Sequence, residues 1–231
     1  MKIGVMDSGI GGLNVLAALI KYRCGDGYVY LSDGKNLPYG EKSGEELKQI
    51  ALRGVRRLVE RGAGAVVFGC NTLSVAALDF VRKRVVPPVF GLLPRPDLLN
   101  GKGLLLCTPT TALYLPNVSP NVCVLTPASL AGLIDKEYPK TALTEEYLSP
   151  LLLPYGDCEE VYLGCSHYSF AKSVFKRVLP KAKLLDGAEN LAALVSAVLP
   201  EKGSKNPSIE LLFTGEDQTE RYLCILSSLL K

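Results

Sequence analysis

The chain opens with apolar and polar blocks that predict a β-strand followed by a helix. Residues 2–6 form a short apolar run, residues 7–12 form a turn rich in glycine, and residues 13–22 place apolar side chains at every third or fourth position. A short continuous run is typical of a buried strand, and the longer spacing is typical of a helix with one buried face. The start of the chain therefore predicts a strand, a loop and a helix in that order.

The same order recurs further along the chain. Residues 28–32 alternate like a strand, residues 33–44 contain loop residues, and residues 45–61 have helical spacing with charges on one side. Residues 65–68 form another apolar run, and helical periodicity returns over residues 73–84. Strands that alternate with helices predict a parallel sheet covered on both faces.

A second series of elements begins after Gly101. Residues 103–107 form a short apolar run that leads into a polar turn, and residues 122–125 predict another strand. Residues 130–137 predict a helix, and residues 160–163 predict a strand that leads into a glycine and a cysteine. The two series are alike, so we expect an α/β protein of two pseudo-symmetric, doubly wound domains with parallel sheets and an active site in the cleft between them.

The expected domain boundaries follow from the connections. Residues 87–96 hold four prolines and are expected to cross between the halves, and residues 200–207 are expected to be a polar linker before a final strand and helix. We therefore expect one domain over residues 1–96 and a second over residues 97–207, with the tail, residues 208–231, docking back on the first. A chain of 231 residues, 48% of them hydrophobic, is long enough for two domains of about 100 residues each.

Charge and hydropathy exclude some classes of partner. The 26 Lys and Arg residues and 23 Asp and Glu residues are scattered, with a net charge of +3, so no basic stripe suggests a nucleic-acid partner. Asp7, Ser8 and three glycines interrupt the first apolar run, and no later run approaches the ~18 residues of a membrane span. We expect a cytoplasmic protein without a membrane partner, and the sequence is compatible with a homodimer.

The seven cysteines include two with an unusual setting. No CxxC spacing occurs, so we expect reduced thiols, no disulfide framework and no metal site. Cys70 and Cys165 each follow a glycine at the end of a predicted strand and precede polar residues. Because cysteine is among the most buried residue types, the other five are expected to fill the core: Cys24, Cys107, Cys123, Cys158 and Cys224.

Two opposed thiols would suit the inversion of an amino-acid α-carbon. Parallel sheets present ligand-binding loops at their carboxyl ends, so two facing halves would place Cys70 and Cys165 on opposite walls of one cleft. Inversion removes a proton from one face of the α-carbon and returns one to the other face, which requires one acid/base group per face. A thiol, with an ordinary pKa of about 8.5, can be tuned for this work by a nearby histidine or a helix N-terminus.

Four separated blocks resemble the signature sequences of bacterial glutamate racemases, in that family's order. They are residues 7–13 (DSGIGGL), 38–43 (PYGEKS), 69–72 (GCNT) and 163–168 (LGCSHY). The resemblance implies a cofactor-independent isomerase of two α/β domains that racemises L-glutamate to D-glutamate by a two-base mechanism and supplies D-glutamate for peptidoglycan.

Carried over by position, the resemblance also implies roles for particular residues. Cys70 and Cys165 would act on opposite faces of the substrate, with Asp7 and His167 assisting their respective thiols. The implied substrate-binding residues, the last two of them in a block similar to the family's threonine-bearing turn, are Ser8, Tyr39, Gly40, Asn71, Thr72, Ser166, Thr108 and Thr111. Some of these types also have simple structural uses, since Asp, Ser, Asn and Thr commonly cap helices and Tyr39 and Gly40 suit a turn.

The chain departs from the family pattern at several positions. Ser166 stands where the family usually has threonine, Ser169 where proline is common, and Arg95 where a small residue is usual. Residues 126–130 (TPASL) replace a Cys-Pro block that leads to a glutamate in the family. Asp135 and Glu137 are the acidic residues nearby that could serve His167 instead.

Other functions remain as alternatives. The departures leave room for a racemase of aspartate or a related amino acid, or for a degenerate racemase-like protein that only binds a ligand. Gly9, Gly11 and Asp33 partly imitate a dinucleotide-binding fingerprint, but Asn14 replaces its third glycine and Asp7 would face the pyrophosphate. A decarboxylase of the same superfamily would need only one of the two cysteines. The sequence therefore favours the racemase.

Overall fold

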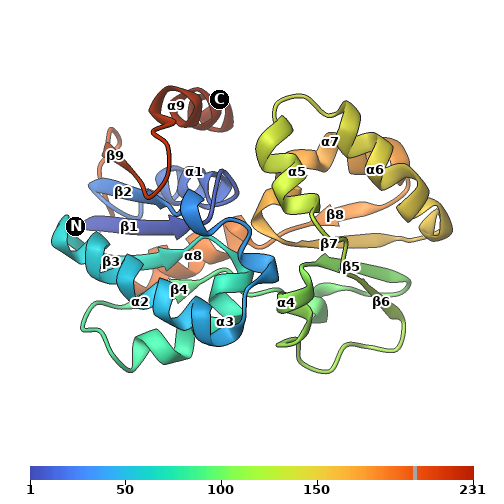
Figure 1. Cartoon of the computed structure of the whole chain (residues 1–231), viewed down its shortest axis with the longest axis horizontal. Helices are drawn as coiled ribbons and strands as arrows, with labels where there is room; N and C mark the ends of the chain where they lie inside the picture. The colour runs from blue at the N-terminus through green and yellow to red at the C-terminus, as the bar shows by residue number, and fades with distance from the viewer. Residues whose placement is uncertain (200–201) are drawn as a thin grey trace.

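The strands of the computed structural model, which describes residues 1–199 and 202–231, form two sheets in which every pairing is parallel (Figure 1). The first sheet has the order β4-β3-β1-β2-β9 and the second has the order β6-β5-β7-β8. Pro200 and Glu201, the start of the predicted linker, lie outside the described residues. The predicted fold class, an α/β protein with two parallel sheets, is confirmed.

The first lobe is the five-stranded sheet with the helices packed on it. One face is covered by α2 and α3, which pack on a core that includes Met6, Val29 and Phe68. On the other face α1 contacts α8 and α9. The bounds of these elements are β1 Lys2–Asp7, α1 Leu13–Lys21, β2 Gly27–Ser32, α2 Gly44–Glu60, β3 Ala63–Phe68, α3 Asn71–Arg82, β4 Val89–Gly91, α8 Ala188–Val198, β9 Ser208–Phe213 and α9 Thr219–Leu230.

The second lobe is the four-stranded sheet with its own helices. In Figure 1, α5, α6 and α7 lie on one side of this sheet. The opposite face packs a small cluster that includes Leu105, Val122 and Tyr162, so the two faces are covered unequally. The bounds are β5 Gly103–Cys107, α4 Pro109–Ala112, β6 Val122–Leu125, α5 Leu130–Glu137, α6 Ala142–Leu152, β7 Glu160–Gly164, α7 Lys172–Val178 and β8 Lys183–Leu185.

Short 3₁₀ helices occupy several of the loops. One of them, η5, directly follows Cys165, where the likeness of the two series of elements predicts a helix. The bounds are η1 Gly34–Asn36, η2 Tyr39–Glu41, η3 Pro96–Leu98, η4 Leu153–Tyr155 and η5 Ser166–Ala171. The helix expected after Cys165 therefore begins as a 3₁₀ segment and becomes α-helical only at Lys172.

Helix α2 shows how the local sequence sets the ends of an element. Ser43 and Glu46 form a capping box, in which the Ser43 hydroxyl accepts from the Glu46 backbone N–H and the Glu46 carboxylate accepts from the Ser43 N–H at 3.0 Å. The helix ends before Gly62, which has a φ of +84°, a backbone conformation that glycine adopts at little cost. The predicted helix over residues 45–61 is confirmed to within one residue at each end.

The proline-rich connection at residues 87–96 contains a strand that the sequence analysis did not predict. Residues Val89–Gly91 form β4, which pairs with β3 at the edge of the first sheet. A three-residue strand is too short to give an alternating pattern, and an edge position tolerates nearby prolines because one side of the strand is unpaired. Tertiary pairing, not local pattern, makes this segment a strand.

The strand register brings the signature loops together. Asp7 pairs with Ser32 and Met6 with Phe68, so the loop after β1 and the loop that carries Cys70 leave the first sheet side by side. Cys107 pairs with Gly164, which places the loop after β5 beside Cys165. Both pairs of loops lie at carboxyl ends of strands, the edge where parallel α/β sheets bind ligands.

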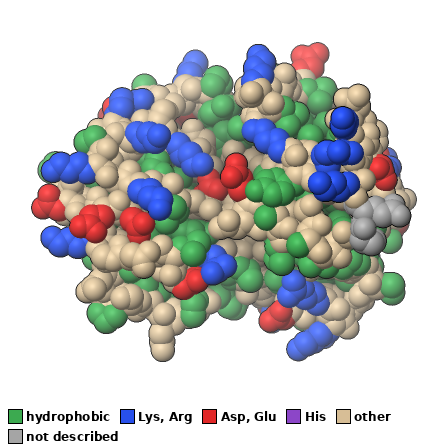
Figure 2. Space-filling model, turned by 180° about the vertical axis from the view of Figure 1, so that it is seen from behind, with side chains coloured by type: hydrophobic (Ala, Val, Ile, Leu, Met, Phe, Trp, Pro, Cys, Tyr) green, Lys and Arg blue, Asp and Glu red, His purple; other side chains and the backbone are tan. Residues whose placement is uncertain are grey.

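None of the helices among residues 1–199 and 202–231 has the length and apolar content needed to cross a bilayer. Figure 2 shows Lys and Arg side chains spread over one face of the molecule, with acidic and hydrophobic side chains between them.

Replacement of Gly69 tests how closely the loops must approach. A Cβ at Gly69 would lie 2.9 Å from the Cα of Gly12, which is backbone of the neighbouring loop and cannot rotate away. We expect Gly69→Ala to lower the free energy of unfolding by about 1–3 kcal/mol. Gly132→Ala is the matched control, because nothing lies within 4 Å of its added Cβ and alanine favours the α5 helix. Urea unfolding of both variants measures the difference, and equal stabilities would contradict the close-packing argument.

Candidate active site

Cys70 and Cys165 lie at equivalent places in the two lobes. Cys70 follows β3 and is the N-cap residue of α3, and Cys165 follows β7 and precedes η5. Each side chain is 4% exposed. Burial first, then the charge of Asp7 and the nearby Cys165, raise the pKa of the Cys70 thiol well above its ordinary value. Cys70 is therefore held as a neutral thiol.

Asp7 ends β1 and is fully buried between the lobes. Its carboxylate accepts hydrogen bonds from the Gly9 N–H at 3.0 Å and from the Ser166 hydroxyl at 2.9 Å, and the Ser8 hydroxyl lies 3.4 Å away. Burial raises the pKa of Asp7, although the nearby His167 charge and these hydrogen bonds oppose the rise. Ser166 belongs to the second lobe, so this contact joins the two halves.

His167 forms a buried pair with Asp135 of α5. Its Nε2 lies 2.8 Å from Asp135 Oδ2, and the same oxygen accepts the Ile10 N–H at 2.8 Å. Burial lowers the pKa of His167, but hydrogen bonds with Asp135 and Cys165 and the charges of the neighbouring carboxylates raise it well above the ordinary value overall. The imidazole is therefore held as a cation beside Cys165.

Asp135, one of the two acidic candidates left by the altered TPASL segment, is the one that contacts the histidine. Burial raises its pKa, but the hydrogen bond and charge of His167, the Ile10 N–H and the charge of Arg221 lower it overall. Arg221 reaches Asp135 from α9, with its Nη1 3.7 Å from Oδ1 and its Nη2 on the Asp135 carbonyl. The carboxylate is thus held by groups from both lobes.

Three threonine hydroxyls meet where α3 faces the turn after β5. Thr72 Oγ1 lies 2.9 Å from Thr108 Oγ1 and 3.1 Å from Thr111 Oγ1, and the Thr108 and Thr111 hydroxyls are 2.9 Å apart. Thr108 is also the N-cap of α4, since its hydroxyl accepts the Thr111 N–H. All three side chains are buried. Helix capping and a place in this cluster are compatible for Thr108.

Tyr39 and Gly40 occupy η2 at the same boundary. The Tyr39 hydroxyl donates to Asp33 Oδ2 at 2.8 Å, so it points toward Asp33. Gly40 lies against the second lobe, because an added Cβ would come within 2.8 Å of Thr108 and its carbonyl accepts the Thr110 hydroxyl at 2.7 Å. The structure thus brings Gly40 to the threonine cluster and directs the tyrosine hydroxyl elsewhere.

Asn71 is buried without hydrogen-bond partners. The residue is 1% exposed, and neither Nδ2 nor Oδ1 of its side chain has a hydrogen-bond partner among the described residues. An unpaired buried amide costs about 1–3 kcal/mol. Asn71 borders a narrow cavity of about 10 Å³ with Gly11 and Ser166, which is too small for an amino acid. The amide leaves a donor and an acceptor free at this place, as a zwitterionic ligand would need.

The other five cysteines do not all fill the core. Cys24, Cys107 and Cys158 are buried, as predicted, but Cys123 and Cys224 are exposed, so the prediction for those two is wrong. Cys123 lies on the short strand β6, where Val124 is exposed as well, and Cys224 lies on the outer side of α9. All seven thiols are free.

Several contacts across the site had no clear signal in the sequence. They come from Ile10 through its backbone, Thr110, Arg221 and Asn14, whose side-chain amide lies 3.5 Å from the Ser166 carbonyl. Each depends on a residue in the opposite lobe or in the tail, which local spacing does not reveal. Among residues 1–199 and 202–231, no group of three or more His, Cys, Asp or Glu side chains is arranged to hold a metal ion.

Comparison with known proteins identifies relatives with this arrangement of lobes. No protein-family model matches the chain. The glutamate racemase of Leptospira borgpetersenii serovar Hardjo-bovis is 36% identical over 211 residues, which cover 81% of this chain and 78% of the relative.

Solved structures of glutamate racemases share the fold. The enzyme from Thermus thermophilus, in complex with beta-chloro-D-alanine, aligns with a TM-score of 0.75 at 29% identity and covers 99% of this chain and 92% of that chain. The enzyme from Campylobacter jejuni aligns with a TM-score of 0.83 at 21% identity over 100% of this chain and 98% of that chain, which shows a common fold. By its identity to the Leptospira relative over most of both sequences, this chain belongs to the glutamate racemase family.

Proposed function

We propose that this protein is an amino-acid isomerase that interconverts L- and D-glutamate without a cofactor, using Cys70 and Cys165 as its two acid/base groups. The observation that carries the proposal is the pair of buried thiols at the carboxyl ends of the two sheets, each beside its own acidic or basic partner. Family membership supports glutamate as the substrate, since the relatives are named for it.

In the proposed reaction, one sulfur removes the α-proton of a bound enantiomer and the other thiol gives a proton to the opposite face. The electron pair of the broken C–H bond stays on the α-carbon until the new C–H bond forms, so one proton leaves and one arrives. The reverse direction exchanges the roles of Cys70 and Cys165. Two positioned groups are needed because a single one would return the proton to the face it came from.

The charged groups around the two cysteines suit one direction of this reaction, in which Cys70 donates the proton. Cys70 is held as a thiol, which is the form that donates a proton. The cationic His167 hydrogen-bonds with Cys165 and would stabilise negative charge on that sulfur. Asp135 keeps the imidazole charged and oriented, so we assign it as the positioning residue that the family's glutamate would otherwise supply.

The substrate would be held by groups that now bond to one another across the lobes. Ser166 bonds to Asp7, and Thr72 bonds to Thr108 and Thr111. An entering amino acid would replace these contacts with its own carboxylates and ammonium group, and it would also pair the free amide of Asn71. Ser8, Tyr39 and Gly40 would line the same region, with Tyr39 fixed by Asp33.

The proposed function includes a cellular role for the product and a division of the chain into two domains. Racemisation of glutamate would supply D-glutamate for peptidoglycan, in the cytoplasm. Residues 1–96 with 208–231 would form one domain and residues 97–207 the other, except that α8, which packs on α1, would move with the first lobe. Separation of the lobes would admit the substrate, since both cysteines are buried in the closed arrangement.

The experiment that tests the activity follows the α-proton of an amino acid in D₂O. Purified protein with reduced thiols is incubated with L-glutamate and, separately, L-aspartate, and loss of the α-proton signal is measured by NMR with chiral analysis of the product. We expect exchange and D-glutamate formation with glutamate. Turnover of aspartate alone would shift the proposal to an aspartate racemase, and no reaction with either in folded protein would favour the degenerate ligand-binding alternative.

Replacement of either cysteine tests the two-base mechanism. We expect Cys70→Ala and Cys165→Ala each to lower kcat for racemisation by at least roughly 100- to 10,000-fold, because each removes the acid/base group for one face. Cys123→Ala is the control, since that thiol is exposed on β6 and should leave kcat unchanged. Near-normal turnover in either active-site variant, with unfolding unchanged, would rule out the paired mechanism.

Replacement of Asp135 tests its hold on the histidine. His167 is the only histidine in the chain, so its imidazole gives a single resolved NMR titration. We expect the imidazole to stay protonated through neutral pH in the wild type and to lose its proton at a lower pH in Asp135→Asn, because burial then acts without the carboxylate. Glu137→Gln is the control, and equal titrations in Asp135→Asn and wild type would contradict the assignment.

The same pair should govern how stability depends on pH. The pKa of His167 is raised by folding, so its contribution is fully present below about pH 6.5 and is lost as pH rises through the folded-state value. The pKa of Asp135 is lowered, so its contribution is present above about pH 4 and is lost as pH falls through the folded-state value. The difference in unfolding free energy between wild type and Asp135→Asn should therefore be largest, about 1.5–3 kcal/mol, near pH 5–6.

A further inference from the structure

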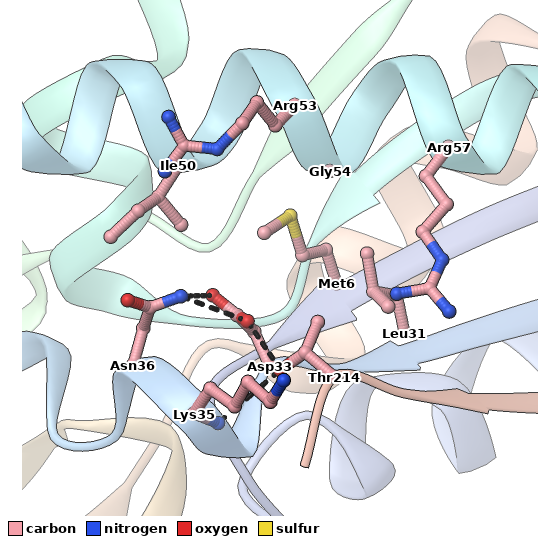
Figure 3. A pocket seen from close by; sticks show the side chains of 10 residues that line it. All are labelled: Met6, Leu31, Asp33, Lys35, Asn36, Ile50, Arg53, Gly54, Arg57 and Thr214. Atoms are coloured by element: carbon pink, nitrogen blue, oxygen red, sulfur yellow. Dashed lines mark hydrogen bonds between the residues drawn. The ribbon is translucent and has the colours of Figure 1, made fainter.

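A cavity outside the candidate active site lies between α2 and the ends of β2 and β9. Its volume is about 240 Å³, and Figure 3 shows the side chains around it. Its apolar part is formed by Met6, Leu31 and Ile50. Its rim holds three cationic side chains, which are Lys35 from η1 and Arg53 and Arg57 from α2.

The three cations have no acidic partner. Among the described residues, Lys35, Arg53 and Arg57 form no ion pair within 4.0 Å. The single hydrogen bond from their charged groups is a long one of 3.4 Å, from Arg57 Nη2 to the Phe213 carbonyl. Like charges that surround a concave surface raise its positive potential, which favours an anion there.

The one carboxylate in the cavity wall is already occupied. Asp33 is 3% exposed, and its oxygens accept from the Asn36 amide, the Tyr39 hydroxyl and the Thr214 hydroxyl, the last two at 2.8 and 2.6 Å. These neutral donors use the lone pairs that a cation would otherwise take. The positive charge of the rim therefore exceeds the single negative charge of Asp33, which is held in place by its hydrogen bonds.

We propose that this cavity binds a small anion that carries a phosphate group and that the bound anion influences Tyr39 through Asp33. Arginine and lysine are the side chains that recognise phosphate oxygens, and the arrangement seen in Figure 3 places the guanidinium groups of Arg53 and Arg57 on either side of Met6. A volume of about 240 Å³ with an apolar side suits a phosphate monoester of a small molecule.

The connection to the active site is short and direct. Thr214 and Tyr39 donate to the same Asp33 carboxylate, and Tyr39 precedes Gly40, which contacts Thr108 of the second lobe. An anion that draws Lys35 or Arg57 toward itself would alter the field at Asp33 and so the placement of Tyr39. This part of the inference depends on the proposed function, because Tyr39 is assigned there to the substrate region.

Binding is tested first, independently of catalysis. Inorganic phosphate is titrated with the full-length protein and followed by ³¹P NMR at constant ionic strength, with sodium chloride as the balancing salt. We expect saturable binding of phosphate. Arg57→Gln and Lys35→Gln should each raise its Kd by roughly tenfold or more, because each removes one charge-assisted hydrogen bond. Arg56→Gln is the matched control, because Arg56 is an exposed arginine of the same helix that does not line the cavity.

The possible results separate the inference from the proposed activity. Absence of saturable binding, or an equal loss in Arg56→Gln, would overturn the site, whatever the enzyme does. Arg53→Gln, at an exposed helix position, provides the same test if Arg57→Gln does not fold. With binding established, phosphate should change KM for glutamate in the wild type and not in Arg57→Gln; an unchanged KM in an active enzyme would overturn the link to Tyr39.

Discussion

The carboxylate of Asp135 is the point at which the candidate site is held together. It is buried, it pairs with the only histidine of the chain, and it accepts a backbone N–H from the loop after β1 of the other lobe. A buried charge of this kind is stable only if every lone pair is used, and Arg221 from the C-terminal helix completes the set. The closed position of the lobes and the charge of His167 therefore depend on one another.

The same constraint explains why the two cysteines, though placed alike, are in different electrostatic states. Cys70 lies near Asp7, and burial together with this carboxylate raises the pKa of its thiol and keeps it neutral. Cys165 hydrogen-bonds with a cationic imidazole. Pseudo-symmetry of the fold thus supplies matching positions, and the single histidine makes them chemically unequal. An enzyme that moves a proton from one face of a carbon to the other needs one acid/base group on each face, and the neighbours of the two thiols differ: a carboxylate at Cys70 and an imidazole at Cys165.

Contact between the two lobes also explains why hydroxyl groups of the candidate site form hydrogen bonds with other protein groups. Thr72, Thr108 and Thr111 form a cluster, and Ser166 bonds to Asp7, so most polar groups of the region are paired in the closed arrangement. Among the described residues, the side-chain amide of Asn71 and the hydroxyl of Tyr168, which follows His167, are buried without a hydrogen-bond partner. Such contacts can be exchanged for a ligand's polar groups at small net cost, since one set of hydrogen bonds replaces another. Asp33 joins Tyr39 to Thr214, the residue after β9, in the wall of the basic cavity under α2.

The sequence by itself determined the repeated strands, most of the long helices and the two Gly-Cys turns, because apolar periodicity and turn residues act over a few positions. It also left Asp135 and Glu137 as the acidic residues near the segment that replaces the family's glutamate block. Only the tertiary structure decided between those two, since the choice depends on how α5 faces η5 and the loop after β1. The strand β4, the exposure of Cys123 and Cys224, and the reach of Arg221 across the lobes were likewise decided by packing between distant segments. Contacts between residues far apart in the chain leave no local pattern, and these are the contacts that set burial, charge and the closed form of the site.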